Sequence, residues 1–195
     1  MSITNLFKKC YNKIKLVNLS EDMGDETMFS KHEYVFHESG GICQIVEIQQ
    51  APLENMPQDR TYYVLRPMHD PNSTIYIPTD SDRVFIRRIL THAEAEAFLA
   101  QIDSIEVLEA PNPKLLRARY VETMRTYSPR AWLSVIRTVE LRAKQLAARS
   151  QRLSETERSF GENARRHLFG ELSLALGIES TQAEALLRQP QEATV

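Results

Sequence analysis

The stretch Tyr34-Val-Phe-His-Glu-Ser-Gly-Gly-Ile-Cys-Gln-Ile45 places two adjacent glycines between two apolar runs. Aromatic and β-branched residues dominate on both sides, which is typical of strands. A phosphate-binding loop would need the pattern GxGxxG or GxxxxGK[ST] ahead of a helix, and here a strand-like run follows the glycines instead. We therefore predict that Gly40 and Gly41 form a bend between two strands, where glycine supplies a backbone conformation that other residues avoid.

Further strand-like runs follow this bend. The segments 61–66 and 74–78 are short, rich in Tyr, Val and Ile, and bounded by Pro, Asp or Asn. Four or five such strands, separated by turn residues, predict a small and strongly bent sheet or barrel.

The hydrophobic period changes to that of helices after about residue 90. Thr91-His-Ala-Glu94 and Ser154-Glu-Thr-Glu157 are capping-box patterns, and Ala110-Pro-Asn-Pro113 cannot continue a helix. The predicted fold class is α+β, with an N-terminal small bent β-barrel followed by a C-terminal all-α helical domain. The predicted divisions are an extension (1–27), a β-barrel (28–90), a linker helix with a Pro-rich hinge (91–113), a helical domain (114–188) and a tail (189–195).

Bulk composition predicts a cytoplasmic protein. The 195 residues include only two cysteines, Cys10 and Cys43, which are far apart and in no CxxC spacing. This pattern argues against a disulfide framework and a structural zinc site, and it suits a reducing compartment. No apolar run approaches the roughly 20 residues of a membrane helix, so we expect no membrane contact.

Charge is distributed unevenly along the chain. Residues 1–113 hold 10 Lys and Arg against 17 Asp and Glu, a net −7, whereas residues 114–195 hold 14 against 9, a net +5. A basic second half would attract a polyanion such as DNA. The alternative, that these charges are only the solvated faces of long helices, remains open at this point.

Catalytic and metal-binding patterns are missing from the sequence. The histidines and Cys43 show no HxxH, HxxxH or CxxC spacing, and no GxSxG motif occurs. We therefore predict a protein that is not an enzyme, with no metal, no cofactor and no small-molecule substrate.

An ordered set of segments resembles the CarD/CdnL/TRCF family of bacterial transcription regulators over about residues 28–188. The segments are 29–47, Tyr62-Tyr-Val-Leu65, Ile75-Tyr-Ile-Pro78 and Ile86-Arg87 in the first half, and Arg119-Tyr120, Val135-Ile-Arg137, 153–158, Ala164 and 171–175 in the second. The resemblance implies a Tudor-like β module that binds the RNA polymerase β subunit. It also implies a helical domain that contacts promoter DNA, with weak sequence selectivity, at the upstream edge of the melted bubble and so modulates the stability of the open complex.

The resemblance also implies which residues make these contacts. Those expected to face the polymerase are Gln49, Tyr76 and Ile77, and those expected to face DNA are Lys114, Leu116, Arg117, Arg119 and Tyr120. The sequence departs from the family at His32-Glu33, where the family has Gly-Asp, and at Leu116, which aligns with the family's tryptophan wedge. An alternative function is a protein–protein adaptor with the same fold and no DNA contact.

Overall fold

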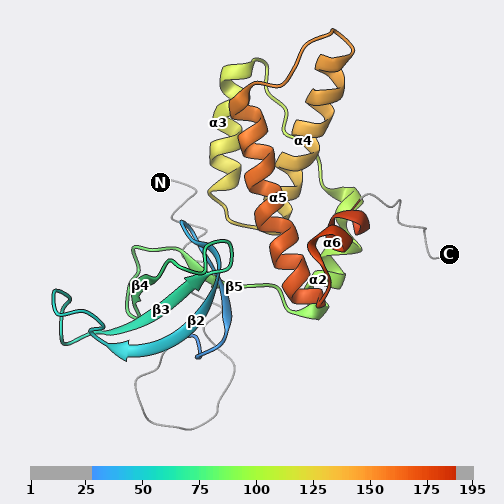
Figure 1. Ribbon diagram of the computed structural model, residues 1–195. Helices are drawn as coiled ribbons and strands as arrows, with labels where there is room; N and C mark the ends of the chain where they lie inside the picture. The colour runs from blue at the N-terminus through green and yellow to red at the C-terminus, as the bar shows by residue number, and fades with distance from the viewer. Residues whose placement is uncertain (1–27, 188–195) are drawn as a thin grey trace.

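The computed structural model describes residues 28–187 and consists of a curled antiparallel sheet followed by helices (Figure 1). The predicted N-terminal extension (1–27) and tail (189–195) lie outside the described residues. The five strands are β1 (Tyr34–His37), β2 (Gly41–Gln50), β3 (Thr61–Pro67), β4 (Ile75–Pro78) and β5 (Ile86–Arg88). The helices are α2 (His92–Leu99), the short 3-10 helix η2 (Ile102–Ser104), α3 (Pro113–Met124), α4 (Pro129–Ala147), α5 (Glu155–Leu176) and α6 (Ser180–Leu186).

The sheet has the order β4-β3-β2-β1-β5, and every neighbouring pair is antiparallel. A register shift between Ile45 and Glu47 bends β2, so the sheet curls into a half-barrel. Its core gathers Phe29, which precedes β1, and side chains that alternate along the strands, namely Val35, Cys43, Ile45, Tyr63, Leu65 and Ile77. The half-barrel followed by helices confirms the predicted order of β and α segments.

The predicted bend at Gly40–Gly41 is confirmed, and glycine is required at each of the two positions for a different reason. Gly41 has a φ of 63°, in the left-handed region where a Cβ is strained. A Cβ on Gly40 would lie 2.6 Å from Cδ1 of Ile75 and 2.9 Å from the sulfur of Cys43. The bend is therefore fixed by backbone conformation at one residue and by close packing at the other.

Helix boundaries follow the capping residues of the sequence. Both predicted capping boxes, at Thr91 and Ser154, are formed, and α5 is capped at its C-terminal end by Gly177, which is left-handed with a φ of 67°. One boundary differs from the prediction. Pro113 is not part of a hinge but stands in the first turn of α3, behind an Asn112 side chain that accepts from the Leu115 amide at 2.9 Å.

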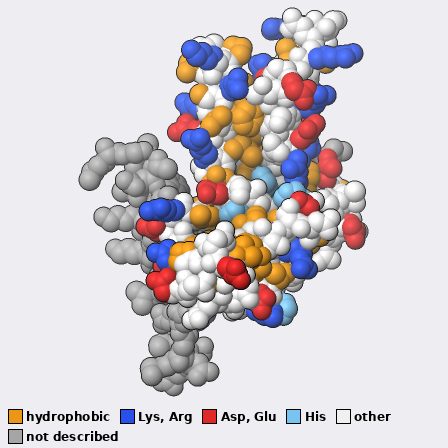
Figure 2. Space-filling view, turned by 60° about the vertical axis from the view of Figure 1, so that its left-hand side comes forward, with side chains coloured by type: hydrophobic (Ala, Val, Ile, Leu, Met, Phe, Trp, Pro, Cys, Tyr) orange, Lys and Arg blue, Asp and Glu red, His pale blue; other side chains and the backbone are white. Residues whose placement is uncertain are grey.

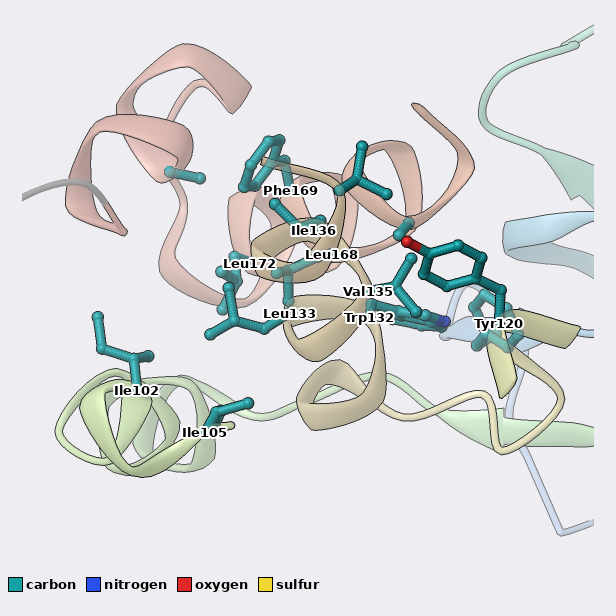
Figure 3. Packing of buried hydrophobic residues seen from close by; sticks show 14 of the residues in the cluster. Ile102, Ile105, Tyr120, Trp132, Leu133, Val135, Ile136, Leu168, Phe169 and Leu172 are labelled. Carbon is teal, nitrogen blue, oxygen red and sulfur yellow. The ribbon is translucent and has the colours of Figure 1, made fainter. Parts of the chain in front are cut away.

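One hydrophobic core joins the sheet to the helices. Phe36 from β1 and Ile42 from β2 belong to the same buried cluster as Trp132 of α4 and Leu168 of α5. Figure 3 shows side chains of α3, α4 and α5 converging in this cluster. Ala95 of α2, in the segment predicted as a linker, is also fully buried there. The segment after the sheet is therefore packed into the helical body.

Candidate functional site

The junction between β5 and α5 contains a buried ion pair. Arg87 donates from its two terminal nitrogens to the two carboxylate oxygens of Glu171, at 2.6 and 2.7 Å. Only 5% of Arg87 and none of Glu171 is exposed. The same carboxylate accepts the Leu90 amide at 2.9 Å, and Nε of Arg87 donates to the Tyr127 carbonyl at 2.8 Å. Because both charges are fully partnered, the pair fixes the sheet edge against α5 and the loop between α3 and α4.

An aromatic cluster lies next to this pair. The Phe36 ring is 5.0 Å from Trp132 and 5.2 Å from His167, and the Arg87 guanidinium stands 5.1 Å from the Phe36 centroid. Burial, together with the positive charge of Arg166, His69 and Arg87, lowers the pKa of His167 to about 4. His167 is therefore neutral near pH 7 and behaves as an aromatic packing residue.

A groove opens beside this cluster, between the β1–β2 bend and the helices. It has a volume of about 620 Å³ and is lined by residues of both parts of the chain, among them Ile42, Met124, Tyr127, Phe160 and His167. In Figure 2 hydrophobic side chains run along the helices above the sheet, with histidine side chains at the junction.

The three residues expected to face the polymerase lie in different settings. Tyr76 and Ile77 belong to β4, an outer strand of the sheet, whereas Gln49 belongs to β2, two strands inward. Strand register places Gln49 on the same sheet face as Tyr76, and both are half-buried. The Ile77 side chain is only 2% exposed and packs in the half-barrel core. Only Tyr76 therefore combines an edge position with a side chain outside the core.

The backbone of Tyr76 points away from the sheet. The Thr79 amide donates to the Thr61 carbonyl at 2.9 Å, so the next directly hydrogen-bonded pair is Tyr63 with Ile77. The alternation of an antiparallel ladder then turns the N–H and C=O of Tyr76 outward. Within the part of the chain that the structure describes, no strand pairs with this outer edge of β4.

The five residues expected to face DNA divide into two groups. Lys114, Arg117 and Arg119 are exposed on α3, and their side chains have no hydrogen bond or ion pair among the described residues. The prediction for Leu116 and Tyr120 requires correction, because they are 6% and 1% exposed and lie in the hydrophobic core. Helical periodicity turns these two residues inward and the three cations outward.

No group of three or more His, Cys, Asp or Glu residues suited to a metal ion occurs among the described residues. Cys43 is fully buried, and burial raises the pKa of its thiol to about 12, which makes it a poor nucleophile. No helix between residues 28 and 187 has the length and apolar character needed to cross a membrane.

Comparison with protein families identifies the chain. The model of the CarD-like/TRCF RID domain matches residues 29–90, and the model of the CarD C-terminal domain matches residues 113–188. Together they define a regulatory, non-catalytic class of protein, the transcription regulators that interact with RNA polymerase. Within that class, the chain belongs to the CarD/CdnL family. No curated protein matches it significantly.

Sequence reasoning assigned no role to Arg87, Glu171 or His167. The ion pair joins residues 84 positions apart, and no local pattern in the sequence connects them. The one available signal was a carboxylate in the apolar context Phe169-Gly-Glu-Leu172, since a buried charge requires a partner.

Proposed function

We propose that this protein binds the RNA polymerase β subunit through the outer edge of β4 and promoter DNA through the exposed end of the helical bundle. It works in the cytoplasm and modulates the lifetime of the open complex at the upstream edge of the bubble. The observation that carries the proposal is the outward backbone of Tyr76, on the free edge of a domain that matches a polymerase-interacting family. An exposed edge of this kind can accept a strand from a partner.

Position and charge support the DNA contact. The N-terminal end of α3 and the connection between α4 and α5 lie at the same end of the bundle, away from the sheet (Figure 1). The first carries Lys114 and Arg117, and the second carries the exposed Arg149 and Arg152. Arginine and lysine neutralise phosphates without reading sequence, which fits weak selectivity. Leu116 is buried, whereas the neighbouring Leu115 is 47% exposed. Leu115 is therefore the apolar side chain that could insert between two base pairs of the DNA.

The polymerase contact is tested with the isolated polymerase β lobe in a titration of the full chain. Tyr76→Pro removes an outward N–H without removing a bond to β3, since proline is tolerated at strand edges. We expect binding to weaken about tenfold or more for Tyr76→Pro and to change little for Tyr76→Phe. Equal affinity in the two variants, with both folded by circular dichroism, would refute pairing along β4.

The alternative function, an adaptor without DNA contact, is favoured by one observation. The burial of Leu116 and Tyr120 removes the two apolar residues first expected at the DNA. For an adaptor, charge reversal at Arg117 and Arg119 should leave every interaction of the protein intact, including its effect on the open complex.

A further inference from the structure

The groove between sheet and helices has the size and chemistry of a small-molecule site. Its volume of about 620 Å³ lies within the usual range of ligand pockets, about 300–1,000 Å³. The β1–β2 bend and the loop after β3 form one wall, and α3, the loop after it, and α5 form the other. Both domains of the chain therefore contribute to one concave surface.

One part of the lining is apolar and aromatic. Met68 from the sheet side faces the groove together with Met124, Tyr127 and Phe160 from the helical side. Aromatic and thioether side chains offer flat, polarisable surfaces on which a nucleobase stacks.

A second part of the lining is cationic. Arg125, at the end of α3, and Arg166, on α5, are both exposed and line the groove. Neither guanidinium has a hydrogen bond or an ion pair among residues 28–187, whereas the guanidinium of the nearby Arg165 is held by Glu140 and Glu184. Glu38 is the one carboxylate among the described lining residues. Two unpartnered guanidinium groups therefore face a hollow with little negative charge to neutralise them.

The local electrostatic field agrees with this excess of positive charge. His167 forms part of the groove floor, and after its burial the largest influences that depress its pKa are the neighbouring Arg166, His69 and Arg87. Since Arg87 is neutralised by Glu171, Arg166 supplies an uncompensated positive charge beside His167. An anion in the groove would be stabilised by the same field.

The aromatic wall is held in place at the cost of backbone strain. Tyr127 has a φ of 50°, which is unusual for a residue with a side chain, and its carbonyl accepts the Arg87 Nε–H at 2.8 Å. Its ring packs 4.9 Å from Phe85 and 5.6 Å from Phe36. Such strained residues concentrate at functional sites, and this one is fixed by the buried ion pair of the junction.

We propose that this groove binds a nucleoside phosphate, with the base against the Tyr127 and Phe160 side of the groove and the phosphate between Arg125 and Arg166. The ligand is a free nucleotide or an unpaired nucleotide of single-stranded DNA, since both present the same base and phosphate. A base inside a duplex is stacked and paired, so duplex DNA does not offer the required face. The site is separate from the β4 edge and from Lys114, Arg117 and Arg119.

The test is a titration of the full chain by calorimetry with ATP, GTP and GDP, and separately with a short single-stranded oligonucleotide. Saturable binding by the free nucleotides, or by the oligonucleotide alone, supports the proposal and tells the two sources apart. Arg125→Ala and Arg166→Ala should each weaken binding about tenfold, because each removes a charge-assisted hydrogen bond to the phosphate. The matched control is Arg83→Ala, an exposed arginine of the β module outside the groove.

Three results would overturn the proposal. The first is no heat of binding for any of these ligands up to about 1 mM. The second is equal weakening by Arg83→Ala, which would indicate a non-specific charge effect. The third is binding of inorganic phosphate as tight as that of the nucleotides, which would show that the aromatic side chains of the groove do not contribute to binding. None of these results bears on polymerase binding through β4, because that contact uses other residues.

Discussion

Arg87 on β5 and Glu171 on α5 form a two-pronged ion pair that is almost completely buried between the sheet and the helical bundle. The β module and the helical domain consequently share a buried polar cluster, in which Arg87 also donates to the Tyr127 carbonyl, and one hydrophobic core. The proposed function, with one surface on a polymerase and another on DNA, requires a fixed distance between the two surfaces. The pair supplies a physical reason for that fixed distance.

The first prediction concerns the stability that depends on this pair. Arg87→Ala leaves the Glu171 carboxylate buried without its counter-charge, so the free energy of unfolding should fall by about 3–5 kcal/mol. Urea denaturation measures it. The control is Arg158→Ala at the exposed pair with Glu155, which should cost no more than about 1 kcal/mol. A similar decrease in both variants would show that the buried pair does not stabilise the junction.

The second prediction concerns the bend between the first two strands. Gly41→Ala forces a residue with a Cβ to a φ of 63° and brings that Cβ to 3.4 Å from the His167 ring. We expect destabilisation of about 1–2 kcal/mol. Gly177→Ala is the matched comparison, since its φ is 67° and nothing lies within 4 Å of the added carbon. Gly41→Ala should be the more destabilising of the two, and the reverse order would contradict the packing at His167.

The third prediction concerns pH. Burial and the positive neighbours lower the pKa of His167 in the folded protein to about 4 from 6.5, so the unfolded chain binds more protons between these values. Stability should therefore fall as the pH decreases from 6.5 towards 4, by up to about 3 kcal/mol from this residue. His167→Phe keeps an aromatic ring and should flatten the slope, as measured by urea denaturation at several pH values.

His37 is the internal comparison for that experiment. Burial also lowers its pKa, so part of the slope should survive in His167→Phe and disappear only when His37 is replaced as well. An unchanged slope in His167→Phe would mean that His167 is already protonated in the folded protein near pH 6.

The fourth prediction concerns the Cys43 thiol. It is fully buried with a pKa raised to about 12, so it should not react with a thiol reagent at about pH 8 in the native protein. A Cys10→Ser variant leaves Cys43 as the single thiol of the chain. One equivalent should react in denaturant and almost none without it. Rapid reaction in native buffer would show that the half-barrel opens readily at β2.

The fifth prediction concerns the proposed DNA contact. Binding of a promoter fragment should weaken as the salt concentration rises. In the double variant Arg117→Ala with Arg119→Ala, the slope of the logarithm of the binding constant against the logarithm of the salt concentration should become smaller by about 1 for each phosphate that is no longer neutralised. Leu115→Ala should shorten the lifetime of the open complex, because the apolar side chain beside Lys114 is removed. Arg83→Ala serves as the control. A salt slope unchanged in the double variant would favour the adaptor function.

Local signals predicted most of the secondary structure. The Gly40–Gly41 bend and the capping boxes at Thr91 and Ser154 are short-range features, so they could be located without coordinates. The start of α6 at Ser180, behind Glu179, lacks such a clear local signal, because glutamate is an uncommon residue at the N-cap position.

The candidate sites were harder to predict, because exposure depends on helical rotation and on tertiary packing. The family resemblance selected the segment around Leu116, but a helix turns successive residues by about 100°, so a neighbour can be exposed where an aligned residue is buried. The result is an inward Leu116 and an outward Leu115. Trp132, the single tryptophan of the sequence, is fully buried.

The sequence by itself determined the order of strands and helices, the position of the bend, the helix caps and the family, since all of these depend on residues close together in the chain or on their order. Only the tertiary structure decided that Arg87 meets Glu171, that Tyr76 turns its backbone outward, and that Arg125 and Arg166 line one groove with Tyr127. These contacts join residues that lie far apart in sequence. They arise when the sheet and the helices bury a shared core, and no local pattern encodes that burial.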